Sequence, residues 1–93
     1  MKPVVLNVRL DEEGEKWIHR VMNLDFQPVV GMEFDFNING GQYATCTVKE
    51  VRYVENDQCL NVWLDLDDVD QPTMTDFDMT LWKEGHMERS PIL

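Results

Sequence analysis

The chain has 93 residues and a formal net charge of −10 at pH 7, because 18 acidic residues outnumber 8 basic ones. This length allows one domain with a modest core. The shortage of Lys and Arg argues against direct nucleic-acid binding, which needs clustered positive charge. No apolar run is long enough to span a membrane, and residues 1–4 form too short an apolar run for a signal peptide, so we expect a cytoplasmic protein.

Two strands are predicted in the first part of the chain, over residues 3–10 and 15–26. The first shows the period-two alternation of a strand with one buried face. The second is ambiguous, because its apolar residues are also spaced as on a helix. We expect a strand there, since Gly14 suits a hairpin turn and would weaken the first turn of a helix. The apolar positions concerned are Val4, Leu6, Val8 and Leu10 in the first strand, and Trp17, Ile18, Val21 and Met22 in the second.

Residues 31–38 give the clearest alternation in the first half of the chain. The following Asn39-Gly40-Gly41 is a strong hairpin signal and leads into a long strand over residues 42–54. A three-residue loop sets every inward residue of one strand opposite an inward residue of the other. The predicted pairs are Phe36 with Ala44, Phe34 with Cys46 and Met32 with Val48.

The alternation of the long strand slips once, at Lys49 and Glu50, which fits a β-bulge. A turn over residues 55–57 then leads into a strand over residues 58–67. The apolar positions match across this turn, and a slip of one residue would move the whole apolar set into water. The predicted pairs are Tyr53 with Leu60, Val51 with Val62, Val48 with Leu64 and Cys46 with Leu66.

A short helix is predicted over residues 75–84, with Thr73 or Thr75 as its cap and Gly85 beyond its end. Phe77 and Leu81 would share its apolar side. The predicted fold class is therefore mainly β, a single domain in which a five-stranded antiparallel meander forms a small SH3-like barrel or a strongly bent sheet. The C-terminal helix would close one opening or cover one face.

The run Leu24-Asp25-Phe26-Gln27-Pro28-Val29-Val30-Gly31, followed by Tyr43, Val48 and Val51, resembles small SH3-like barrel proteins of unknown function. Such proteins occur in bacteria and their mobile elements, including phages and integron cassettes. The resemblance covers about 45 residues and implies a fold, with no catalytic residue.

Acidic residues are expected to gather at one end of the meander, because alternate connections of such a sheet lie at the same end. Solubility is the simplest interpretation, and attraction of a basic protein partner or mimicry of nucleic-acid phosphates are the functional ones. A calcium site is weakly supported, since the run after Asp65 lacks the glycine and the later glutamate of an EF-hand loop. The acidic pole comprises Asp11, Glu12, Glu13, Asp65, Asp67, Asp68 and Asp70, with Asp76 and Asp78 close by.

No residue pattern indicates an enzyme, a cofactor or a metal site. His19 and His86 lack a matching cluster of ligands and are interpreted as surface or structural residues. Cys46 falls on the core face and Cys59 on the opposite face beside a turn, so both are expected to be free thiols. Neither a nucleophile elbow nor a phosphate-binding loop is present.

The aromatic residues suggest a binding surface. Trp63 points away from the apolar face of its strand, so either the C-terminal helix or another protein should cover it. We expect a protein-interaction module, a candidate accessory factor of a mobile genetic element, that forms a homo-oligomer or binds another protein. The alternatives are an acidic inhibitor that mimics nucleic acid and a small-ligand-binding barrel with a cleft lined by Trp17, Phe34, Phe36 and Trp82. The expected partner-binding residues are Trp63, Trp82, Ile92 and Leu93.

Overall fold

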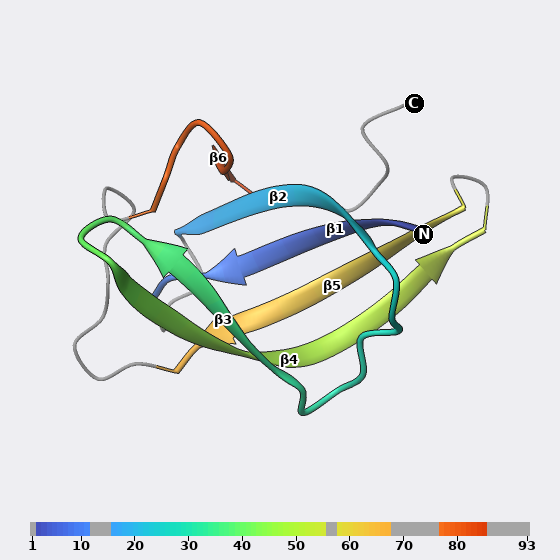
Figure 1. Cartoon of the computed structure of the whole chain (residues 1–93). Helices are drawn as coiled ribbons and strands as arrows, with labels where there is room; N and C mark the ends of the chain where they lie inside the picture. The colour runs from blue at the N-terminus through green and yellow to red at the C-terminus, as the bar shows by residue number, and fades with distance from the viewer. Residues whose placement is uncertain (1, 12–15, 56–57, 68–76, 86–93) are drawn as a thin grey trace.

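The computed structural model describes residues 2–11, 16–55, 58–67 and 77–85, and its strands form one curled sheet that resembles half of a barrel (Figure 1). The mainly β class predicted from the sequence is confirmed. The six strands of the sheet follow the order β3-β4-β5-β1-β2-β6. Their bounds are β1 Lys2–Arg9, β2 Trp17–Leu24, β3 Glu33–Ile38, β4 Gln42–Val54, β5 Cys59–Leu66 and β6 Lys83–Glu84.

The antiparallel β3-β4-β5 unit has the register predicted from the alternation of apolar residues. Phe36 lies opposite Ala44, and the register shifts between Val48 and Glu50, at the predicted β-bulge. The register holds beyond the bulge because a shift of the strand pairing by one residue would turn the apolar side chains toward solvent. The other confirmed pairs are Phe34 with Cys46, Tyr53 with Leu60, Val51 with Val62, Val48 with Leu64 and Cys46 with Leu66.

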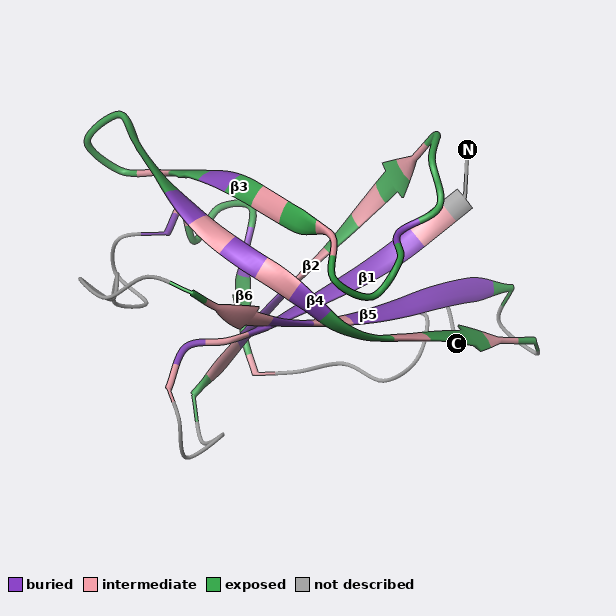
Figure 2. Cartoon of the chain, turned by 90° about the horizontal axis from the view of Figure 1, so that it is seen from below, coloured by how far each residue is buried: buried purple, intermediate pink, exposed green. Residues whose placement is uncertain are grey.

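The five-stranded meander is wrong, because β1 lies between β5 and β2. β1 runs parallel to β5 with Leu6 opposite Val62, and antiparallel to β2. The physical reason is visible in the burial of β1, whose successive residues Val4, Val5 and Leu6 are all 0% exposed. A strand buried on both faces belongs in the middle of a sheet, and Figure 2 shows β1 and β5 as its most buried strands.

The second strand is confirmed as a strand rather than a helix. β2 pairs with β1 along its whole length, from Trp17 opposite Arg9 to Leu24 opposite Lys2. Its inward residue Ile18 is 0% exposed. The helical spacing of its apolar residues was misleading because they divide between the two faces of the sheet, with Val21 on one and Met22 on the other.

The predicted C-terminal helix is wrong over residues 77–84, and residues 75–76 lie outside the described part of the chain. A turn leads from Asp78 to Trp82, whose N–H donates to the Asp78 carbonyl at 3.0 Å, and β6 follows. The Asp78 carboxylate accepts hydrogen bonds from the backbone N–H and the hydroxyl of Thr80 at 3.0 and 2.6 Å. Such local bonds compete with helix formation.

The core lies on one side of the sheet, which we call the inner face, and the opposite side is the outer face. Phe77 and Trp82, each 1% exposed, pack onto the inner face from the C-terminal segment. Trp82 contacts Phe36 edge-on, with ring centroids 5.0 Å apart. The buried core also contains Val4, Leu6, Val8, Leu10, Ile18, Ala44, Cys46, Val48, Leu60, Val62 and Leu64.

Candidate interaction surface

The two tryptophans expected at a contact surface lie on opposite faces of the sheet. Trp82 is 1% exposed and buried against Phe36 and Phe77, so it offers no surface to a partner. Trp63 lies on the outer face and is half-buried, with its ring edge-on to Trp17 at a centroid distance of 5.3 Å. Ile92 and Leu93 lie outside the described residues.

The C-terminal helix that was expected to cover Trp63 does not form over residues 77–84. Phe77 and Trp82 pack on the inner face, and Leu81 is 52% exposed. Trp17, the partner ring that the structure does show, stands on the outer face because it pairs with Arg9 at the end of β1. Trp17 therefore lies on the face of the sheet opposite Phe36 and Trp82, and the cleft that would have favoured the ligand-binding hypothesis does not include it.

The described acidic residues of the expected pole do gather at one end of the sheet, where β1 and β5 end and β2 and β4 begin (Figure 1). Each is engaged. The Asp11 carboxylate accepts the Lys16 N–H at 3.2 Å, and Asp65 forms an ion pair of 2.8 Å with Arg9. Glu12, Glu13, Asp68 and Asp70, together with the neighbouring Asp76, lie outside the described residues.

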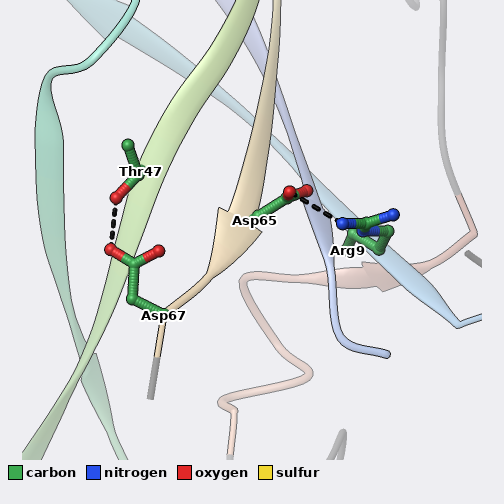
Figure 3. Close-up of polar contacts among 4 residues, drawn as sticks. All are labelled: Arg9, Thr47, Asp65 and Asp67. Carbon is green, nitrogen blue, oxygen red and sulfur yellow. Dashed lines mark hydrogen bonds and ion pairs between the residues drawn. The ribbon is translucent and has the colours of Figure 1, made fainter. Parts of the chain in front are cut away.

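Asp67 is held by β4, as Figure 3 shows beside the Arg9–Asp65 pair. Its carboxylate accepts a hydrogen bond from the Thr47 hydroxyl, and its N–H donates to the Thr45 carbonyl at 2.9 Å. The Thr45 hydroxyl in turn donates to Asp35 at 2.6 Å. The threonines and Arg9 therefore tie this acidic end together.

Burial and the acidic end raise the pKa of the Cys46 thiol, which lies on β4. Burial raises the pKa of the Cys46 thiol to about 12, and the nearby charges of Asp67, Asp35 and Asp65 add to the increase. Such a thiol stays protonated and inert at neutral pH. Neither cysteine is in a disulfide, and both are buried, including Cys59, which was expected on the face opposite the core.

His19 is a structural residue, one of the two roles predicted for it. It is 8% exposed, and its Nδ1 lies 3.0 Å from the Gly85 carbonyl. A carbonyl only accepts hydrogen bonds, so Nδ1 carries the proton and the bond fixes β6 to β2. His86 lies outside the described residues, and within the described ranges no group of His, Cys, Asp or Glu could hold a metal ion.

A row of aromatic rings runs along the inner side of β3 and ends in solvent. Phe34 stacks on Phe36 with a centroid distance of 5.6 Å, and Phe26 follows at 6.1 Å from Phe34. Exposure rises along this row, from 7% at Phe36 to 48% at Phe26. Val29 and Val30 follow Phe26 in the same connection, and they are 53% and 66% exposed. We call Phe26, Val29 and Val30 the loop patch.

The local backbone explains why Val30 is exposed. The Met32 N–H donates to the Val29 carbonyl at 3.1 Å and Gly31 has φ +93°, which together define a type II turn with Val30 at its corner. A corner side chain points into solvent, and any polar residue would serve the turn equally well. The turn geometry therefore does not account for an apolar residue there.

The two edges of the sheet differ in how they are protected. The Val48 N–H donates to the Met32 carbonyl, so alternation directs the backbone groups of Glu33, Asp35 and Asn37 outward from β3. Two of these residues carry charges, which discourage the pairing of another strand. The corresponding stretch of β2, residues 20–24, carries no charge after Arg20.

The β2 edge is covered over only part of its length. Of the described strands only β6 pairs there, at Ile18 and His19. Beyond His19, Val21 is 44% exposed. Sequence reasoning missed this edge and the loop patch, because a meander places β2 between two neighbouring strands and reduces residues 27–31 to a short connection. The available signal was the pair of valines in a turn that needed no apolar residue.

Comparisons with known proteins give no relative from which a function could be inferred. No family model matches the sequence, and no curated protein or solved structure matches it. The SH3-like resemblance therefore stays a prediction. Within the part of the chain that the structure describes, no helix is long and apolar enough to cross a membrane.

Proposed function

We propose that this chain is a protein-interaction module that binds a partner through the loop patch and the uncovered part of the β2 edge. The observation that carries the proposal is the exposure of three large apolar side chains, Phe26, Val29 and Val30, in one short connection of the chain. Large apolar groups exposed close together on a small protein mark contact sites. Aromatic residues such as Phe26 supply much of the energy of such contacts.

The other described groups give less support to a catalytic role. The Cys46 thiol is protonated at neutral pH, and His19 is held by the Gly85 carbonyl. Burial and the carboxylates near Cys46 keep its thiol protonated rather than activating it. A binding role needs only the exposed apolar surface that is present.

Selection from a random peptide library displayed on phage tests the proposal. Clones selected with the unmodified chain should bind the double variant Val29→Ser, Val30→Ser about thirtyfold more weakly, since each half-exposed valine contributes about 1 kcal/mol when covered. Tyr43→Ser is the matched control, because Tyr43 is 64% exposed on β4. The proposal fails if the clones respond equally to both variants or to neither. The homo-oligomer predicted from the sequence is a separate question, which sedimentation at micromolar concentration answers.

A further inference from the structure

We infer that the uncovered edge of β2 is a strand-addition site, where an extended segment of a partner rich in Lys or Arg and apolar residues pairs with Val21 and Asn23. The inference rests on the proposed function and specifies how the partner binds. It concerns backbone pairing, which the loop patch alone does not require.

The backbone geometry gives the positions of the available groups. The Gly85 N–H donates to the Trp17 carbonyl at 2.7 Å on the side of β2 away from β1. In an antiparallel ladder the N–H and C=O of alternate residues point to the same side. The backbone groups of Val21 and Asn23 therefore point outward as well, and β6 ends before reaching them.

The chain itself shows that this edge accepts a strand. β6 pairs there antiparallel to β2, with Lys83 opposite His19, and then Trp82 turns into the core. The pairing stops at that point because Trp82 is drawn inward to Phe36 and Phe77. A strand from another protein would continue the sheet where β6 leaves it.

The side chains around this edge suit an extended apolar segment. Val21 is 44% exposed on the outer face, while Met22 and Leu24 are half-buried on the inner face. Phe26 lies just beyond the end of β2. A paired strand would alternate its side chains between these two sides, so apolar residues would cover them while backbone bonds fix the register.

Charge and area favour a basic segment over a second copy of this chain. Two copies would each carry a formal charge of −10 and would repel each other, whereas a segment rich in Lys or Arg would be attracted. The loop patch offers on the order of 300 Å², well below the roughly 800 Å² per partner of a stable dimer. Arg20 lies at the other end of the edge, 5.8 Å from the Trp82 ring.

The test uses amide exchange of the ¹⁵N-labelled full chain with a defined probe, acetyl-Lys-Val-Lys-Val-Lys-Val-amide. Saturating probe should slow exchange of the Val21 and Asn23 amides at least tenfold. The same peptide with alternate backbone amides N-methylated keeps its charge and side chains but cannot complete the ladder, so it should leave these amides unprotected. A peptide with Glu in place of Lys should bind at least tenfold more weakly.

Val21→Pro removes an outward N–H without breaking a bond to β1, and it should weaken probe binding at least tenfold. Asn37→Pro makes the same change on the β3 edge and should leave binding within twofold. Should Val21→Pro unfold the chain, Val21→Lys gives the same readout by charging the edge. Failure of the probe to bind, protection at Glu33 and Asp35 instead, or dimers in sedimentation that Val21→Pro abolishes would each overturn the inference. Probe binding that depends on Val29 and Val30 without protection at Val21 would also overturn it, while leaving the proposed function intact.

Discussion

Ionisation of Cys46 should make the fold less stable in alkali by a calculable amount. The thiol is 0% exposed, and burial with three neighbouring carboxylates raises its pKa from 9.0 to about 12. Between these two values the unfolded chain loses the thiol proton and the folded chain keeps it, so the stability contributed below pH 9 is lost as the pH rises. At pH 10 the loss relative to pH 7 is RT ln(1 + 10), or about 1.4 kcal/mol.

Urea unfolding followed by tryptophan fluorescence at pH 7 and pH 10 measures this loss. The matched variant is Cys46→Ala, because every other side chain is the same in the two proteins and its contribution cancels in the difference. The free energy of unfolding should fall by about 1.4 kcal/mol more in the unmodified chain than in the variant. Equal falls in the two proteins would show that the folded chain releases the Cys46 proton as readily as the unfolded chain, and the burial argument would be refuted.

Three further changes test the core, the outer face and the acidic end. Trp82→Ala should cost about 3 to 5 kcal/mol in urea unfolding, because it empties the centre of the aromatic core. Asn61→Leu should raise the urea midpoint, since Asn61 is 1% exposed and neither side-chain polar atom has a hydrogen-bond partner among the described residues. Raising sodium chloride from about 10 mM to about 300 mM should raise the thermal midpoint, because screening weakens repulsion in a chain of formal charge −10. A flat or falling midpoint in either of the last two measurements would contradict the corresponding argument.

The hairpins could be predicted because their information is local. Alternation of apolar residues within a few positions of Asn39-Gly40-Gly41 left one register that buries Phe36 with Ala44, and the structure has it. The bulge at Lys49 was visible for the same reason, as a single break in parity. Each of these features depends on residues close in sequence, and a wrong register would expose many of them at once.

The parallel pairing of β1 with β5 could not be derived in the same way. Arg9 and Asp65 meet across 56 positions of sequence, and no turn residue signals that contact. The sequence signal was the pair of adjacent apolar residues Val4 and Val5, which points to burial on both faces of the strand. In the structure adjacent residues of β5, Asn61 and Val62, are also buried. The polar Asn61 disguised this signal, because an asparagine at an alternate position indicates a solvent-facing side of a strand.

The candidate site was missed for a reason that follows from the same topology. Because β1 lies between β5 and β2, the chain leaves β2 at Leu24 and must begin β3 at the opposite edge of the sheet. That requires residues 25–32 to form a connection rather than a tight hairpin, and this connection carries the loop patch. On the side of β2 away from β1, it leaves only the short β6 among the described strands. The insertion of β1 therefore produces both halves of the proposed binding surface, whereas in a meander β3 would have covered the β2 edge and Val21 would have been an interior residue of the sheet.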